Sequence, residues 1–205
     1  MRTLLIIAVW FLGWGTWYRT EEKIRPQDAP ATKKDSFLDL FQPIPTDTFS
    51  IFPHSRDEEA EGYRFKGRRI DTSFAVFLKG KYSLDRIEEF RACFKHRISD
   101  RYFLLLFRSP GEFFTSPVSI MIWDKDLGEI ADLLASVGRN EETAGYSFYS
   151  TTLLTINKEE KIMQLEKRSI ECDPAGDVYS GEEYETVCDT VVELYVLEGS
   201  RFKLK

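Results

Sequence analysis

Residues 102–107, Tyr102-Phe103-Leu104-Leu105-Leu106-Phe107, are apolar at every position. A short run with no polar face is typical of a β-strand that is covered on both sides. The stretch therefore predicts the central strand of a sheet, and the chain on either side of it must supply the two covering layers.

The segment before this run predicts the main helix of the domain. Ser83 or Asp85 is a candidate N-cap. Apolar residues then recur at the i, i+3, i+7 and i+11 positions of an amphipathic helix, namely Ile87, Phe90, Phe94 and Ile98. This helix is expected to cover one face of the central strand.

Shorter elements are predicted nearby. Residues 35–41 favour a short capped helix that ends before Pro43. Residues 74–78 favour a strand that ends at Gly80, and residues 118–123 favour another strand.

Residues 126–138 fit either a helix or a strand. Asp126 and Glu129 form a capping-box pattern, and apolar residues at i, i+3, i+4 and i+7 favour a helix that ends at Gly138. Alternating apolar residues in the same segment favour a strand, reached through a turn at residues 124–128. The strand is preferred because it repeats the pattern of the chain that follows.

Two hairpins are predicted in the last third of the chain. Residues 151–156 pair with residues 161–170, and residues 190–197 pair with residues 201–204. The expected fold class is therefore α+β: an antiparallel β-meander of about seven or eight strands, a curled sheet or an open barrel, packed with one main helix.

The N-terminus predicts export. Residues 1–18 join one positive charge, Arg2, to an uninterrupted apolar run, which is typical of a signal peptide. Three tryptophans in this segment favour the membrane interface, so an uncleaved membrane anchor is the alternative. Residues 19–34 contain two prolines and predict a flexible tether, and residues 35–205 are expected to form a single globular domain.

Charge limits the partners. The formal net charge is −6, whereas a nucleic-acid binder needs a positive surface to displace counterions. Nucleic acid is therefore not an expected partner, and membrane contact is expected only through the N-terminal segment.

The three cysteines divide into a pair and a single thiol. Cys172 and Cys188 flank one loop at the ends of two strand-like runs, and export permits a disulfide between them. Cys93 is expected to be a buried thiol on the predicted helix. It lies three residues from His96, but a structural role for both is preferred over a nucleophile and base.

Motifs for chemistry are weak in this sequence. It contains only two histidines and no hydrolase elbow, phosphate-binding loop or zinc-protease motif. No cofactor is expected and a non-enzymatic role is preferred. Weak candidates for a metal site are Asp173, Asp177 and Glu182, although a solvated acidic loop is the preferred interpretation. Weak candidates for a ligand cleft are Tyr146, Tyr149, Phe113 and Phe114, although packing is preferred for them.

The functional prediction follows from export and from the missing catalytic motifs. No motif names a family, but the order of export signal, tether and antiparallel domain is similar to that of many bacterial cell-envelope proteins. The chain is expected to be periplasmic or extracellular, free or anchored, and to bind a protein, peptide or small ligand without catalysis. The alternatives are a carboxylate-dependent hydrolase of an envelope polymer, with Glu88, Glu89 and Asp132 as open candidates, and a structural assembly subunit.

Overall fold

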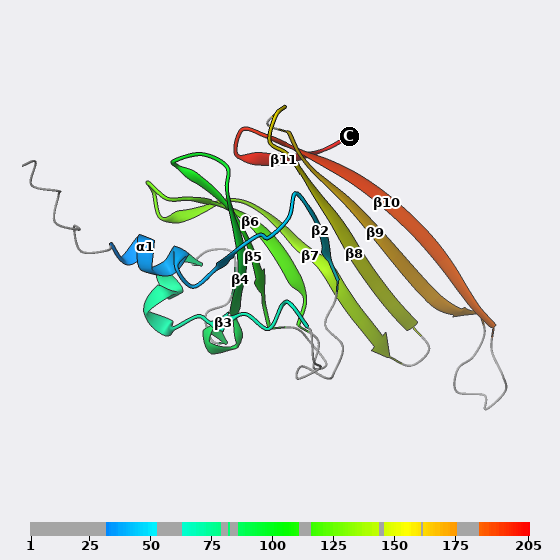
Figure 1. The fold of residues 1–205 in the computed structure, drawn as a ribbon. Coiled ribbons are helices and arrows are strands. Elements are labelled where there is room, and N and C mark those ends of the chain that lie inside the picture. The colour runs from blue at the N-terminus through cyan, green and yellow to red at the C-terminus, as the bar shows by residue number, and fades with distance from the viewer. Residues whose placement is uncertain are drawn as a thin grey trace, which may run out of the picture. The chain divides into compact units, whose positions relative to one another are not determined.

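β-Strands dominate the computed structural model of the chain, which describes residues 32–52, 63–78, 82, 86–110, 116–143, 146–160, 162–175 and 185–205. The described strands form one eleven-stranded sheet (Figure 1). They are β1 (Gln42–Pro43), β2 (Thr48–Ile51), β3 (Arg68–Arg69), β4 (Arg91–Arg97), β5 (Tyr102–Arg108), β6 (Val118–Asp124), β7 (Glu129–Thr143), β8 (Tyr146–Asn157), β9 (Ile162–Ala175), β10 (Glu185–Glu198) and β11 (Arg201–Leu204).

The order of neighbours is β1-β4-β5-β6-β7-β8-β9-β10-β11. β2 pairs with β8, and β3 pairs with β4. From β4 onward each strand pairs antiparallel with the next. The expected antiparallel meander is therefore confirmed, and it is an open sheet.

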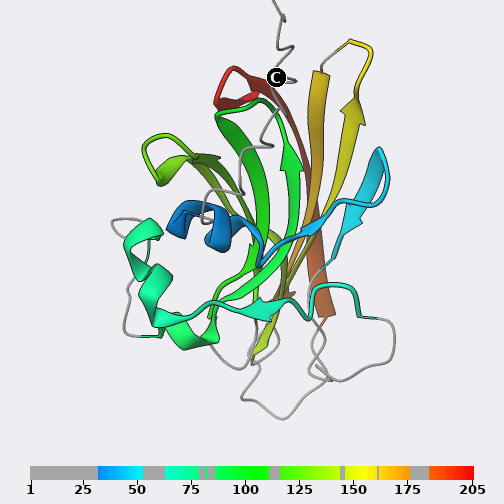
Figure 2. The same cartoon turned by 60° about the vertical axis from the view of Figure 1, so that its left-hand side comes forward.

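β7 divides the sheet into two layers. Its first part pairs with β6, whereas its last part, from Arg139 onward, pairs with β8. The strand changes layer where Ser136 has a positive φ of 54° and where Gly138 lies against the backbone of Phe52. One layer holds β3 to β6, and the other holds β2 and β8 to β11 (Figure 2).

The first core fills the space between the two layers. It joins Phe94, Leu104 and Ile120 of one layer to Leu154 and Leu165 of the other. β11 and β7 are also joined by a hydrogen bond, which the Phe202 amide donates to the Asp132 carboxylate (2.7 Å). The two layers therefore share one apolar core.

The second core lies on the other face of β4 to β6. It is covered by α1 (Lys33–Leu38) and by two 3-10 helices, η1 (Thr72–Phe77) and η2 (Ile87–Glu89) (Figure 2). The Phe37 ring of α1 lies 5.3 Å from the Trp123 ring of β6. Residues 102–107 are thus a central strand covered on both faces, as predicted: Leu104 and Leu106 enter the first core, and Leu105 and Phe107 enter the second.

The predicted main helix is wrong. Residues Arg91–Arg97 form β4, only Ile87–Glu89 are helical, and both candidate caps lie outside the described residues. The apolar stripe that suggested one helical face serves two cores instead, because Ile87 and Phe90 enter the second core while Phe94 packs in the first. The register of β4 against β5 shifts between Ala92 and Phe94. This irregularity changes the alternation of side chains, so Phe90 and Phe94 reach different cores although they are four positions apart. The fold is thus mostly β, and the α+β class with one main helix is not confirmed.

A second prediction, the strand at residues 74–78, is also wrong. Residues Thr72–Phe77 form η1, which begins where the Asp71 carboxylate accepts a hydrogen bond from the Ser73 amide (2.8 Å). Phe77 and Leu78 are buried in the second core, so the apolar run serves packing in a helical turn.

Several other predictions are confirmed. The short helix predicted at residues 35–41 forms, although it starts earlier, at Lys33, with Thr32 as its cap. Residues 118–123 are strand, the strand preference for residues 126–138 is correct from Glu129 onward, and both C-terminal hairpins form.

Candidate functional site

One side of β10 is unpaired along most of its length among the described residues. On its other side, β9 pairs with it over twelve residues without a bulge. On the open side, β11 covers only Tyr195–Glu198, and the Lys205 amide donates to the Leu194 carbonyl (2.9 Å). Figure 1 shows β10 running along the outside of the sheet with β11 beside one end only. We call the described stretch from Thr186 to Glu193 the β10 edge.

The pairing geometry shows which backbone groups point outward. The Cα atoms of Cys172 and Cys188 are 4.0 Å apart, the short spacing of a pair that exchanges no backbone hydrogen bonds. Cys188 and its alternate neighbours therefore direct their N–H and C=O groups away from β9. The bond from Lys205 to the Leu194 carbonyl agrees with this assignment. The residues with outward groups along the β10 edge are Thr186, Cys188, Thr190 and Val192.

The β10 edge lacks the devices that normally block an open strand. Proteins usually protect such edges with Lys, Pro or a bulge. Residues 185–198 contain no Lys, Arg or Pro, and the ladder with β9 is regular. Val187, Val191 and Val192 are exposed by 58%, 55% and 53%. A β-branched strand with free backbone groups is a template for another strand.

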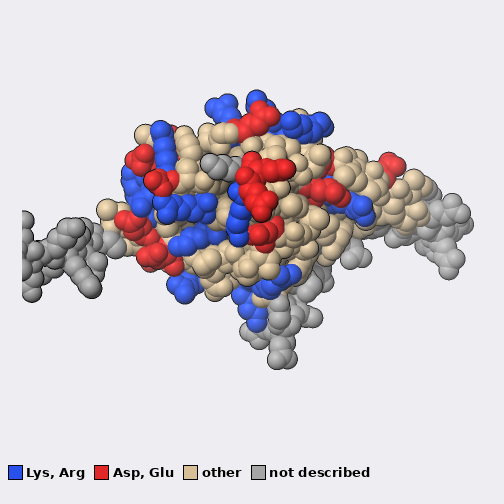
Figure 3. All heavy atoms as spheres, turned by 45° about the horizontal axis from the view of Figure 1, so that its top comes forward, with Lys and Arg blue, Asp and Glu red and all other residues tan. Residues whose placement is uncertain are grey.

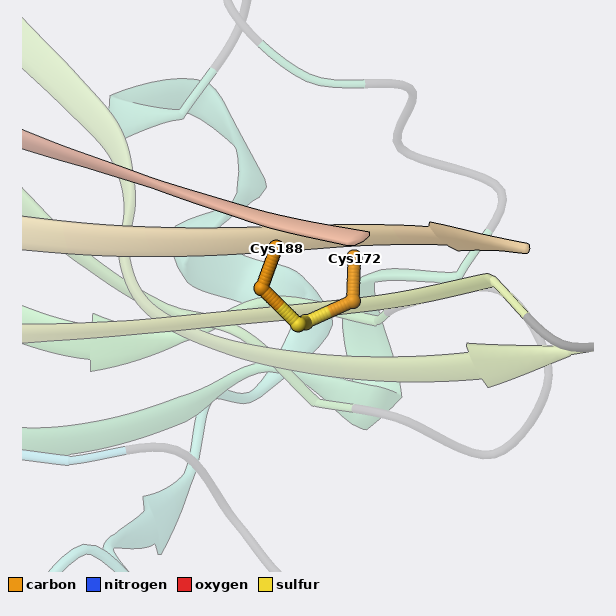
Figure 4. The surroundings of a disulfide bond; sticks show 2 residues. All are labelled: Cys172 and Cys188. Atoms are coloured by element: carbon orange, nitrogen blue, oxygen red, sulfur yellow. A yellow bond between two sulfur atoms is a disulfide. The ribbon is translucent and has the colours of Figure 1, made fainter. Parts of the chain in front are cut away.

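The predicted disulfide is confirmed and lies on this ribbon. Cys172 of β9 and Cys188 of β10 are directly opposite each other and bonded (Figure 4). The bond ties the two strands together where β10 is exposed on both faces. It is compatible with an oxidising, exported location. Among the described residues, no helix is both long and apolar enough to cross a membrane.

The face of β8 to β10 that points toward the first core, here the inner face, changes character along the strands. One cross-strand row is Leu154, Leu165 and Tyr195, which pack in or against that core. The next row is Thr152, Lys167 and Glu193, and a row farther out is Phe148, Glu171 and Asp189. The inner face is therefore apolar at one end and acidic toward the disulfide.

Glu193 is held by two neighbours on this face. Tyr195 donates its hydroxyl to the Glu193 carboxylate (2.7 Å), and the Lys167 ammonium lies 3.1 Å from the other oxygen. The hydrogen bond from Tyr195, together with Lys167, lowers the pKa of Glu193. Burial, with the hydrogen bond to Glu193, raises the pKa of Tyr195 to about 12. The Glu193 charge is thus partly neutralised.

Asp189 differs from Glu193 in having no such neighbour. It lies directly opposite Glu171 on the inner face, and its carboxylate makes no hydrogen bond or ion pair with any residue that the structure describes. Glu171 accepts a hydrogen bond from the Tyr146 hydroxyl (3.2 Å). Like charges at directly opposed positions destabilise a sheet. Asp189 is therefore the carboxylate of the β10 edge that is most available to a partner.

Of the predicted metal and cleft candidates, only Asp173, Tyr146 and Tyr149 lie among the residues that the structure describes. Asp173 is an exposed residue of β9, whereas Asp177 and Glu182 lie outside the described residues. Within the described ranges, no three His, Cys, Asp or Glu side chains gather to hold a metal ion. Tyr146 and Tyr149 lie three positions apart on β8 and so face opposite sides of the sheet. Phe113 and Phe114 lie outside the described residues.

Cys93 has the properties of a structural thiol. The helix expected to carry it is a strand, and the thiol donates to the Phe65 carbonyl (3.4 Å). Burial raises the pKa of Cys93 to about 12, the opposite of what a nucleophile needs.

The candidate carboxylates serve local contacts. Glu88 pairs with Arg69 beside a pocket of about 390 Å³, Glu89 pairs with Arg86, and Asp132 accepts from Phe202. Every carboxyl pKa that clearly shifts in the described part of the chain is lowered. A general acid needs a raised pKa, and none of these shifted carboxyl groups, Glu89 among them, has one.

Comparisons with known protein families, curated proteins and solved structures find no match for this chain. Sequence reasoning predicted residues 190–197 as a strand but missed its open side. The visible signal was the β-branched run without Lys, Arg or Pro.

Proposed function

We propose that this chain is an exported, non-catalytic binding domain of the cell envelope that holds a protein partner by strand addition. An extended segment of the partner pairs with the β10 edge. The observation that carries the proposal is the row of four residues with outward N–H and C=O groups on a strand exposed on both faces. Strand addition uses main-chain hydrogen bonds for affinity and alternate side chains for specificity.

The energetics suit a specific but reversible complex. Four residues offer up to eight backbone groups, and each hydrogen bond contributes about 0.5–1.5 kcal/mol net. Ordering the partner segment offsets part of this gain. The side chains on the two faces of the added strand must therefore supply the rest of the affinity.

Export is supported by two independent features. The N-terminal segment has the charge and apolar run of a signal or anchor. The Cys172–Cys188 disulfide is compatible with an oxidising compartment. A domain outside the reducing cytosol keeps this bond, and the bond keeps β10 in register with β9.

The same edge also supports the second candidate function, an assembly subunit that pairs with copies of itself. Open, regular edges promote edge-to-edge association. The two functions differ in the partner, so they are separated by measuring the oligomeric state of the chain alone.

The proposal is tested at Thr190, whose amide points outward. Thr190→Pro removes this donor and leaves the hydrogen bonds to β9 intact. Thr190→Val is the matched control because it keeps the amide and the β-branch. The probes are seven-residue strand-forming peptides, Thr-X-Thr-Val-Thr-X-Thr, in which X is Lys, Gln or Glu.

We expect at least one peptide to bind the full chain in mild detergent and to slow amide exchange at Cys188, Thr190 and Val192. Thr190→Pro should weaken that binding about tenfold, the effect of one lost hydrogen bond, while Thr190→Val should not. Equal binding by both variants would overturn strand addition at the β10 edge.

A further inference from the structure

We infer that the partner segment is basic, with two Lys or Arg residues four positions apart facing Asp189 and Glu193 across the new strand pair. This inference rests on the proposed strand addition and names the chemistry of the partner. It follows from the charges on the inner face of β10 and from the period of a β-strand.

Alternation along the added strand sets the positions. Asp189, Val191 and Glu193 share the inner face of β10, so residues j, j+2 and j+4 of the partner face them. Directly opposed Cβ atoms lie about 4.5–5.5 Å apart, within reach of a Lys or Arg side chain. Val191 is exposed and takes an apolar residue at the middle position. The pattern is therefore basic-x-apolar-x-basic.

Charge complementarity selects a basic rather than a neutral segment. Asp189 lies opposite Glu171 and has no ion pair with any described residue. Glu193, in contrast, is already paired with Lys167. A cation on the added strand, opposite Asp189, would offset the repulsion between Asp189 and Glu171. The chain as a whole is also acidic, at −6, which favours the approach of a basic partner.

On the opposite, outer face of β10, the partner needs fewer charged residues. Thr190 and Val192 point to that side, with Ile170 and Arg168 as their neighbours on β9. In Figure 3 charges of both signs cover much of the visible face, but the right-hand part, where Figure 1 places the ends of β9 and β10, is mostly uncharged. Outer-face residues of the partner are therefore β-branched or small polar residues.

The same charges disfavour a second copy of this chain as the partner. Two β10 edges paired antiparallel about Val191 would place Asp189 opposite Glu193 of the copy, and pairing about Asp189 would oppose the two Asp189 side chains. Pairing about Thr190 avoids direct opposition but leaves Asp189 about 7–8 Å from Asp189 and Glu193 of the copy. Registers nearer residue 198 meet β11.

The experiment compares the Lys, Gln and Glu peptides defined above on the full chain at low and high salt. We expect the Lys peptide to bind about 30-fold more tightly than the Glu peptide in 50 mM salt, with the Gln peptide between them. The ratio should fall to about 5-fold or less in 500 mM salt because exposed charges are screened.

Charge variants at Asp189 and at a distant control position, Asp100, test whether the preference for the Lys peptide depends on Asp189. Asp189→Lys should abolish the preference for the Lys peptide, and the milder Asp189→Asn should reduce it about threefold. Asp100→Lys makes the same change of net charge at the β4–β5 turn, where the Asp100 side chain is 94% exposed, and should keep the preference. A preference that survives Asp189→Lys would overturn the inference.

The remaining outcomes separate this inference from the proposed function. If all three peptides bind equally and Thr190→Pro weakens them all, the basic pattern is wrong and strand addition stands. If none binds, both are overturned. If the chain alone forms a dimer that Thr190→Pro dissociates, the partner is a second copy and the basic partner is wrong.

Discussion

The two outer edges of the sheet differ in how far they are covered by other strands. The edge formed by β4 is covered by β1 and β3, two strands of only two residues each. Flanking backbone bonds extend this cover: the Ile44 amide donates to Lys95 (2.9 Å), and the Ile70 amide donates to Phe90 (3.1 Å). The β10 edge has no comparable cover among the described residues.

The difference shows how the same open ladder can be closed or left available. The cover of β4 comes from chain segments that also build the second core: α1 precedes β1, and the Lys95 ammonium of β4 donates to the Leu38 carbonyl (2.8 Å). β1 also contains Pro43, which cannot donate to a further strand. The β10 edge keeps regular geometry and β-branched side chains instead, the features that favour pairing.

The largest expected effect comes from proline scanning of the β10 edge. Val191→Pro removes an amide that points toward β9 and should lower the free energy of unfolding by about 3–4 kcal/mol. Thr190→Pro removes an outward amide and should cost less than about 1 kcal/mol. Urea unfolding measures both variants. Equal losses would show that the outward assignment of backbone groups is wrong.

The covered edge is tested at Gly67, which precedes β3. Gly67 has a φ of 63°, and a Cβ atom there would lie 2.8 Å from the Ala92 carbonyl oxygen and 2.9 Å from the Cys93 sulfur. Gly67→Ala should therefore destabilise the protein by about 3 kcal/mol. Gly199→Ala is the control, because Gly199 has a φ of 64° but no neighbour within 4 Å, and should cost about 1 kcal/mol. Equal costs would mean that the packing around β3 is loose.

Loss of the disulfide tests the ribbon that presents the open edge. The double variant Cys172→Ser, Cys188→Ser removes a cross-link between residues sixteen positions apart. It should lower the free energy of unfolding by about 2–3 kcal/mol in the chain-entropy description. Amide exchange should quicken most near positions 172 and 188. Unchanged stability after reduction of the native protein would contradict the expected role of the bond.

The pH dependence of Glu193 gives a smaller effect. Its folded-state pKa is lowered from 4.5, so its contribution to stability is present above that value and is lost as the pH falls through the folded-state pKa. Glu193→Gln should cost about 1 kcal/mol at pH 7, since the pair is partly exposed. The difference from the natural protein should shrink as the pH drops below 4.5. A difference that grows with acidity would have the wrong sign.

The smallest expected effect is a gain. Asp189→Asn removes one of two opposed carboxylates and should stabilise the protein by about 0.3 kcal/mol. The same change should weaken binding of the Lys peptide. Urea unfolding and peptide binding on the same preparation measure both changes. A loss of stability would show that Asp189 has a structural partner.

Local pattern accounts for the elements that were predicted correctly. The apolar run at residues 102–107, the turn-separated runs near the C-terminus and the two cysteines that flank one loop each depend on neighbours in the chain. The helix predicted between residues 85 and 98 failed because its stripe is also the pattern of a bulged strand between two cores. Spacing along one segment does not show how many layers that segment will contact.

The sequence by itself determined that the chain is rich in antiparallel strands, that residues 102–107 lie at the centre and that Cys172 and Cys188 are positioned to bond. These follow from hydrophobic period and chain distance, which are local properties. The tertiary structure alone decided that β1 and β3 cover β4 while the β10 edge stays open. Which strand edge finds a neighbour depends on where distant segments pack, because backbone groups of every strand are alike and only the fold selects their partners.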